Sequence, residues 1–193
     1  MRDPQFIIFT GPMFGSKTTR MLAAIDRLRW QKRKYLAFKP KIDDRYGSNR
    51  ITTHSGGSVE AYEISTGLEL RQIFSERSGH DIIAVDEAFM IEGVADVLIS
   101  LFKKGNTVIV SSLQLSSWGE PFEEMQKMMP WATKIEICPA VCPITGKDAY
   151  YSYCKRTKQD EILIGGAESY EPRCFEFHEH VNPNYKGEQN EYT

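Results

Sequence analysis

Short apolar runs alternate along the chain with segments whose apolar positions recur at helical spacing. The runs predict strands at residues 6–9, 34–40, 58–64, 80–89, 106–112 and 132–137. The helical spacing predicts helices over about 17–34, 66–74, 93–105 and 121–129. Most of these runs are continuous, as in strands buried on both faces, whereas residues 58–64 alternate like a half-exposed strand. Residues 41–58 are polar and lack clear periodicity, so we expect a long and functional loop there.

Strands that alternate with helices predict an α/β fold with a mostly parallel sheet and helices on both faces. This pattern covers residues 1–138, which we interpret as the main domain. Residues 139–180 hold three of the four cysteines and little periodicity, and we interpret them as a small second lobe. The polar residues 181–193 are expected to form a disordered tail.

Composition narrows the functional classes. The 193 residues are 41% hydrophobic and 26% charged, as in an ordinary globular protein, with a net charge of −2. Without an overall basic field, neither nucleic acid nor an anionic membrane is an expected partner. No segment approaches a membrane span, so we expect a cytoplasmic protein. In that compartment the four cysteines favour metal binding or burial over disulfides.

Residues 10–19, TGPMFGSKTT, follow the first apolar run and resemble the phosphate-binding loop G-x-x-x-x-G-K-[ST]. Gly11, Lys17 and Thr18 match the pattern. The second glycine does not, since Gly15 comes one residue early and Ser16 stands in the glycine position. A helix that starts after such a loop favours an anion at its N-terminus. The alternative is a glycine-containing turn that carries a lysine by chance.

A second motif, IIAVDEAF, ends an apolar strand with the adjacent carboxylates Asp86 and Glu87. In open α/β sheets ligands gather at the carboxyl ends of the strands, where the first strand also delivers the loop. Asp86 could hold a metal ion, and Glu87 could accept a proton from an attacking hydroxyl or water. A solvated strand end is the alternative. Together the two motifs predict a P-loop NTPase (RecA-like) fold and nucleotide-dependent phosphoryl transfer.

Further motifs indicate which phosphoryl transfer. GPMF, KPKIDDRY, VDEAF, GEPF, AVC and IGGAESYEPRC occur in this order between Phe6 and His178. With these motifs the chain resembles thymidine kinases of the cellular type, a zinc-containing family of bacteria, phages, poxviruses and animals. The resemblance implies a P-loop domain followed by a small lasso- and zinc-ribbon-like lobe. It also implies an ATP- and Mg²⁺-dependent enzyme that is a homo-oligomer, either a tetramer or a dimer.

The resemblance assigns roles to individual positions. The ATP-binding residues would be Gly11, Pro12, Met13, Phe14, Gly15, Ser16, Lys17 and Thr18. Thr18, Asp86 and Asp43 would lie around Mg²⁺, with Arg45 near the phosphates, and Glu87 would be the catalytic base. Met13 and Leu113 would line the nucleoside pocket, and the lasso residues Ile164, Gly165, Gly166 and Tyr170 would close over it. Tyr170 could instead be a core aromatic of the small lobe.

Several positions depart from the family pattern. Phe89 stands where the family usually has glutamine, and Ser117 replaces the aromatic residue that stacks on thymine. Trp118 replaces an arginine, and it could either stack on the base or pack against protein. At Ser16 a left-handed conformation would cost about 1–2 kcal/mol. If that strain existed only in the bound loop, it would weaken ATP binding roughly tenfold.

The zinc-ligand pattern is also incomplete. Cys142 is followed by Thr145, and Cys174 by Phe177, where the family has its second ligands. Cys138 and His178 could complete a tetrahedral set with Cys142 and Cys174. Alternatively, the lobe has lost its metal and packs its cysteines as small hydrophobic residues.

The expected activity is phosphorylation of a deoxynucleoside 5′-hydroxyl, with thymidine or deoxyuridine as substrate. Three alternatives remain open at this point. The departures at Phe89 and Ser117 would suit a homologue with another nucleoside preference. An inactive nucleotide-binding protein and a helicase-like or motor ATPase are the others.

Overall fold

The computed structural model describes residues 3–43, 49–53, 56–155 and 165–187. Its central feature is a six-stranded parallel sheet with the strand order β5-β2-β6-β7-β1-β8. The strands are β1 (Phe6–Thr10), β2 (Tyr35–Pro40), β5 (Tyr62–Ile64), β6 (Ile82–Asp86), β7 (Thr107–Ser112) and β8 (Lys134–Ile137). Every residue of β6 and β7 is buried, as their uninterrupted apolar runs predict.

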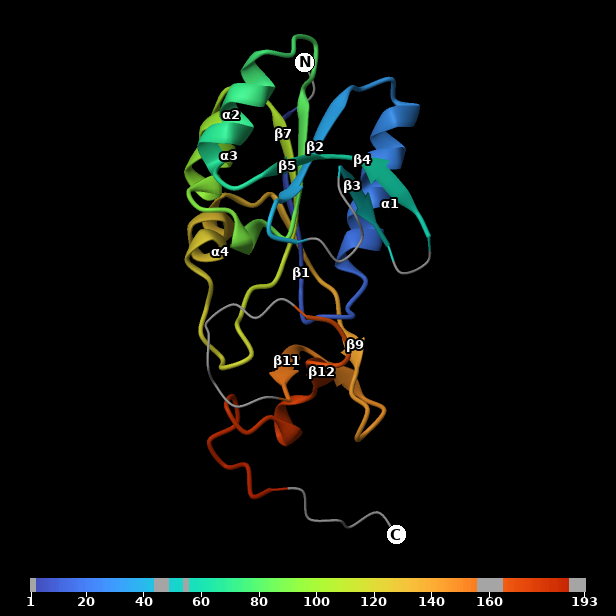
Figure 1. Cartoon of the computed structure of the whole chain (residues 1–193), viewed down its shortest axis with the longest axis vertical. Helices are drawn as coiled ribbons and strands as arrows, with labels where there is room; N and C mark the ends of the chain where they lie inside the picture. Colours follow the sequence, from blue (N-terminus) through green and yellow to red (C-terminus); the bar gives the residue numbers. More distant parts are fainter. Residues whose placement is uncertain (1–2, 44–48, 54–55, 156–164, 188–193) are drawn as a thin grey trace.

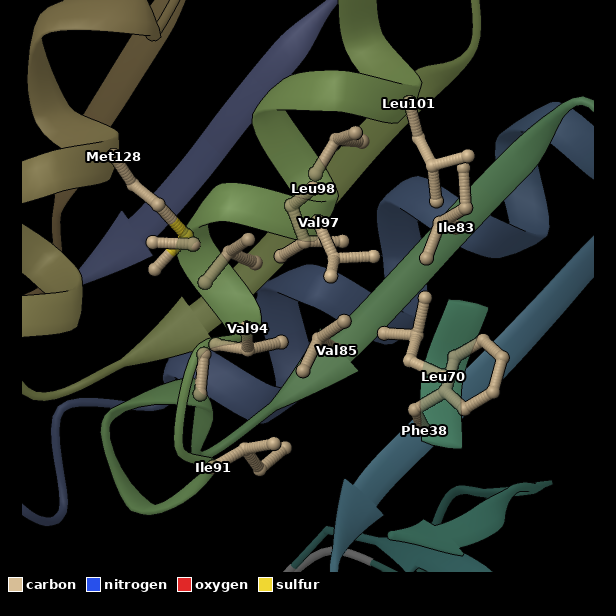
Figure 2. Close-up of a cluster of buried hydrophobic side chains, with 14 of the residues drawn as sticks. Phe38, Leu70, Ile83, Val85, Ile91, Val94, Val97, Leu98, Leu101 and Met128 are labelled. Atoms are coloured by element: carbon tan, nitrogen blue, oxygen red, sulfur yellow. The ribbon is translucent and has the colours of Figure 1, made fainter. Parts of the chain in front are cut away.

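Helices cover both faces of the sheet, as predicted (Figure 1). Helix α1 (Lys17–Trp30) lies on one face. Helices α2 (Gly67–Ser75), α3 (Val94–Lys103) and α4 (Glu123–Met128) lie on the other. Figure 2 shows this second interface, where Val94 and Leu98 of α3 face Val85 of β6.

Two predicted boundaries are wrong. The first helix ends at Trp30 and not near residue 34, because Lys32 adopts a left-handed conformation and Arg33 N–H donates back to Leu28 O. The last predicted helix, 121–129, is shorter and continues as a 3-10 turn, Met129–Trp131, in which Pro130 lies.

The segment 41–64 differs most from its prediction. Residues 58–64 form two strands, β4 (Ser58–Glu60) and β5, which pair in different sheets. Strand β4 pairs antiparallel with β3 (Arg50–Thr52), which lies inside the predicted loop. Alternation alone cannot reveal this division, because it depends on which distant strand each half meets.

The residues after 138 form two small antiparallel sheets, and we call residues 139–187 the C-terminal segment. One sheet pairs β9 (Ala140–Val141) with β10 (Asp148–Ala149), and the other pairs β11 (Tyr151–Cys154) with β12 (Tyr170–Arg173). A 3-10 turn follows at Phe175–Phe177. Figure 1 shows this segment next to the carboxyl ends of the main strands.

The predicted disordered tail begins inside the described residues. Val181 and Asn182 donate backbone hydrogen bonds to His178 O, so the chain makes turns after residue 180. Residues 188–193 lie outside the described part of the chain.

Candidate functional site

The loop between β1 and α1 has the backbone of an anion-binding nest. Phe14 and Ser16 have positive φ angles of 66° and 61°, although neither is glycine. Alternate left-handed residues turn successive N–H groups toward one concave side, which suits phosphate oxygens. The loop leads directly into α1, whose N-terminal dipole also favours an anion.

Gly15, the displaced glycine, is required because the backbone of Cys138 lies close to it, and not because of its φ angle. A Cβ atom at Gly15 would lie 2.2 Å from the carbonyl oxygen of Cys138, and one at Gly11 would lie 2.3 Å from the same oxygen. Ser16 itself takes the left-handed conformation. The loop therefore keeps a left-handed residue at the usual glycine position, while position 15 needs glycine for space.

Lys17 is the first residue of α1, and its side chain reaches back to the loop. Its side chain is buried, and its Nζ donates to Pro12 O over 2.7 Å. This bond ties the ammonium group to the loop, and Lys17 lines the cavity described below.

The side chains of Thr18 and Asp86 contact each other at the edge of the sheet where β6 ends. The Thr18 hydroxyl lies 3.2 Å from both carboxylate oxygens of Asp86, the last residue of β6. Burial, followed by the charge of Glu87, raises the pKa of Asp86 to about 7. Lys17 and Thr18 oppose this rise. Mg²⁺ binds oxygen ligands such as hydroxyl and carboxylate groups, so this pair fits the ion that the resemblance implies.

Glu87 follows Asp86 in a strained conformation. Its φ and ψ are 47° and 45°, a left-handed geometry that costs a non-glycine residue on the order of 1–3 kcal/mol. Such strain is typical of functional positions, and here it redirects the carboxylate as the chain leaves β6.

A cavity of about 390 Å³ joins these groups. Its lining comes from five regions: the loop, the first turn of α1, the end of β6, described residues between Lys39 and Thr53, and the lasso-like segment. The lining residues are Met13, Phe14, Ser16, Lys17, Thr18, Thr19, Lys39, Asp43, Arg50, Ile51, Thr52, Thr53, Asp86, Glu87, Gly166 and Ala167. Sequence reasoning placed Asp43 here but missed Lys39 and the strand β3.

The predicted nucleoside residues are only partly brought together. Met13 and Gly166 line the cavity. The other described candidates, Gly165, Tyr170, Leu113 and Trp118, are not among its lining residues. Arg45 and Ile164 lie outside the described residues.

Trp118 packs against protein. Its ring lies 4.2 Å from that of His180, measured between centroids. Phe89 similarly contacts Phe122, at 4.4 Å between centroids. Trp118 and Phe89, which both depart from the family pattern, thus each pack against another aromatic ring.

The loop is also bonded to the C-terminal segment. Met13 N–H donates to the hydroxyl of Ser152 over 2.9 Å, and Ser152 is itself buried. The carbonyl oxygen of Ser152 lies 2.9 Å from His178 Nε2. Because a carbonyl can only accept, His178 carries its proton on Nε2.

The four zinc candidates do not form one cluster. Cys142 and Cys174 share a small apolar cluster, whereas Cys138 lies in the core beneath α1. His178 is surrounded by the rings of Tyr151, Tyr153 and His180. Within the described ranges, no group of three or more His, Cys, Asp or Glu side chains is placed to hold a metal ion.

Comparison with known proteins finds a family model and a curated relative that match most of the chain. A family model described as thymidine kinase matches residues 4–178. A curated thymidine kinase of Thermococcus kodakarensis is 36% identical over 181 residues, covering 89% of this chain and 92% of that protein.

Two solved structures are more distantly similar. The genome packaging NTPase B204 of Sulfolobus turreted icosahedral virus 2, in complex with ATP-gammaS, has a TM-score of 0.48 and 13% identity. That match covers 75% of this chain and 79% of the other. The ATPase domain of G40P has a TM-score of 0.44 and 10% identity, and the match covers 70% of each chain. Among the helices of the described ranges, none has the length and apolarity to cross a membrane.

Proposed function

The chain belongs to the thymidine kinase family, and we propose that it transfers the γ-phosphoryl group of ATP to the 5′-hydroxyl of thymidine or deoxyuridine. The observation that carries this proposal is the cavity in which Lys17, Asp86 and Glu87 lie together with Gly166. Phosphate-binding and proton-accepting groups thus border the lasso-like segment that would cover a nucleoside.

The phosphate loop would bind the ATP phosphates through its backbone. The left-handed residues Phe14 and Ser16 give the loop its concave side, and α1 adds its dipole. Lys17 would stabilise the negative charge on the transferring group. Fixed N–H groups of this kind need no reorganisation during the reaction, which is why such a loop promotes transfer.

Mg²⁺, when bound, would supply positive charge that neutralises the β- and γ-phosphates. Thr18 and Asp86 are the residues that would hold it, and Asp43 lines the same cavity. Ionised Asp86 is the form that binds a cation, so the raised pKa of this carboxyl opposes binding at acidic pH.

Glu87 would act as the general base. Glu87 lines the cavity together with Asp86, Gly166 and Ala167. A carboxylate that accepts the 5′-hydroxyl proton during attack gives the nucleophile its charge as the new P–O bond forms.

The segment at Gly165 and Gly166 would exclude water from the bound nucleoside. Gly166 N–H donates to Glu168 Oε1 over 2.6 Å, and Tyr170 N–H donates to Gly166 O over 3.0 Å. These bonds form a compact turn at the edge of the cavity. Covering a substrate in this way prevents hydrolysis of ATP by water.

A homologue with another nucleoside preference is the second candidate. The observation that favours it is the contact of Phe89 with Phe122, because an apolar ring replaces the usual hydrogen-bonding glutamine. The base pocket would then select its substrate by shape more than by polar contacts.

A panel of deoxynucleosides with γ-labelled ATP and Mg²⁺ tests the proposal. We expect the highest kcat/KM for thymidine or deoxyuridine. A higher value for another deoxynucleoside would favour the second candidate. ATP hydrolysis that requires nucleic acid, without nucleoside phosphorylation, would contradict both and indicate a helicase-like or motor ATPase.

The family membership also leads us to propose a cytoplasmic homo-oligomer, either a tetramer or a dimer. Light scattering coupled to size-exclusion chromatography measures the mass directly. A mass of 22.1 kDa, that of the single chain, would contradict an oligomer.

A further inference from the structure

Two turns in the C-terminal segment place a pair of thiols side by side. The first turn follows Cys142 and is closed by Gly146 N–H, which donates to Cys142 O over 2.9 Å. The second follows Cys174 and is closed by Phe177 N–H, which donates to Cys174 O over 3.2 Å. Both cysteines are buried in the same small cluster. Backbone hydrogen bonds therefore close both turns.

The remaining two positions of the tetrahedral pattern carry side chains that do not bind zinc well. Thr145 Oγ1 lies 3.6 Å from Cys174 Sγ, within hydrogen-bond distance of a sulfur atom. Phe177 packs against the buried cluster that contains both cysteines. Structural zinc sites take four Cys, His or carboxylate ligands, and a hydroxyl and a phenyl ring supply neither charge nor a strong lone pair.

The surroundings of the thiols are those of an apolar core. Ala140 and Ala149 are buried in the same cluster, and Phe14 of the phosphate loop and Ile144 pack against it. The Cys174 sulfur lies 3.6 Å from both Thr145 Oγ1 and Glu176 Oε2. Hydrogen bonds and apolar packing thus satisfy the groups that a metal would otherwise organise.

Neither of the other candidates can replace the missing ligands where it lies. Cys138 is packed in the core beneath α1, and its Sγ lies 3.6 Å from Glu136 O. His178 donates to Ser152 O and is enclosed by aromatic rings. Moving either residue to the thiol pair would break these contacts.

We propose that the C-terminal segment of this chain folds without a structural zinc ion. The Thr145–Cys174 hydrogen bond and the packing of Phe177 replace two ligands, and Cys142 and Cys174 serve as buried core thiols. This inference concerns the stability of the segment, and it holds whichever nucleoside the enzyme phosphorylates.

Metal analysis and thermal unfolding of the purified full chain test the proposal. We expect zinc at least about tenfold below one ion per chain, and a melting temperature that a strong zinc chelator leaves unchanged. One zinc per chain, together with a fall in melting temperature after chelation, would overturn the proposal. Neither measurement depends on activity.

A paired variant provides the positive control. Thr145→Cys combined with Phe177→Cys restores four thiols, and we expect it to bind one zinc per chain. Chelation should lower the melting temperature of this variant by more than about 5 °C. If this variant fails to fold, Cys142→Ser with Cys174→Ser decides the matter. Its zinc content should equal that of the unchanged protein, whereas a loss of bound zinc would contradict the proposal.

Discussion

The carbonyl oxygen of Cys138 lies where a side chain at Gly15 would begin, since a Cβ atom there would be only 2.2 Å from it. The consensus phosphate loop assigns one glycine to this region. Here two requirements fall on two residues: Gly15 provides space, and Ser16 provides the left-handed conformation. Each can be tested separately.

Gly15→Ala should damage the loop. The added methyl group meets backbone, which cannot move aside as a flexible side chain can, so we expect a loss of about 1–3 kcal/mol in unfolding free energy. The KM for ATP should rise about tenfold or more. Urea unfolding and initial-rate kinetics measure the two effects. Unchanged values of both would mean that the loop has space at position 15.

Ser16→Gly is the matched variant, and it should act in the opposite direction. Glycine relieves the left-handed strain, and its greater freedom in the unfolded chain offsets part of the gain. We expect a net stabilisation of about 0.5–1 kcal/mol with little change in the KM for ATP. The swap Gly15→Ser with Ser16→Gly should still raise the KM, because its new Cβ atom meets Cys138 O. A lower KM for the swap would instead mean that strain at Ser16 weakens ATP binding and that position 15 has space for a side chain.

Glu87→Gln should abolish most of the transfer without affecting the fold. Glutamine keeps the size of the side chain but cannot accept the hydroxyl proton, so kcat should fall about 10²–10⁴-fold. Circular dichroism and the melting temperature provide the control for folding. Full activity of this variant would rule out Glu87 as the base.

Thr18→Val and Thr18→Ser form a matched pair at the proposed metal position. Valine keeps the branched shape but removes the hydroxyl that lies 3.2 Å from Asp86, whereas serine retains it. We expect the Mg²⁺ concentration for half-maximal rate to rise about tenfold for valine and little for serine. Equal effects of both variants would indicate that the methyl group matters and the hydroxyl does not.

Asp86 should make stability depend on pH. The pKa of its carboxyl is raised to about 7 by burial and by Glu87, from an ordinary value of 3.8. The folded state therefore binds more protons than the unfolded state between these values. The contribution of Asp86 to stability should fall as pH rises from about 4 to about 7, by on the order of 1–4 kcal/mol, and then level off. Subtracting the urea-unfolding profile of Asp86→Asn isolates this slope, and an unchanged difference across the range would contradict it.

Trp118 should act through packing. Its ring lies against His180, so Trp118→Ala should lower the unfolding free energy by about 1 kcal/mol or more. The KM for thymidine should stay within about twofold, and His180→Ala should show the same pattern. If the KM rose tenfold at an unchanged melting temperature, Trp118 would instead contact the base.

The sequence was sufficient for the main sheet and the phosphate loop because both depend on local pattern. The apolar run before Asp86 is typical of a strand buried on both faces. Its end indicates the edge of the sheet at which the site lies. The roles of Gly15 and Ser16 could not be separated in the same way. The role of Gly15 depends on Cys138, which is more than 120 residues away in the chain and approaches only after folding.

The contributions of Lys39 and strand β3 to the cavity were missed for a similar reason. Lys39 is buried with its Nζ 3.7 Å from Glu63, and although Lys39 begins the motif KPKIDDRY, the motif does not reveal this partner. Strand β3 exists only through its pairing with β4, so periodicity within residues 41–58 carries no trace of it. Polar residues of this kind are recognised only when their tertiary partners are known.

The hydrogen bond from Met13 to Ser152 has a thermodynamic consequence for how the binding of one substrate affects the binding of the other. It joins the segment that would hold ATP to the segment that would hold the nucleoside. Any change in affinity that one substrate transmits to the other through this bond must be reciprocal, because the two paths to the ternary complex have equal total free energy. Cooperativity between the substrates, if seen in one direction, must therefore have the same magnitude in the other.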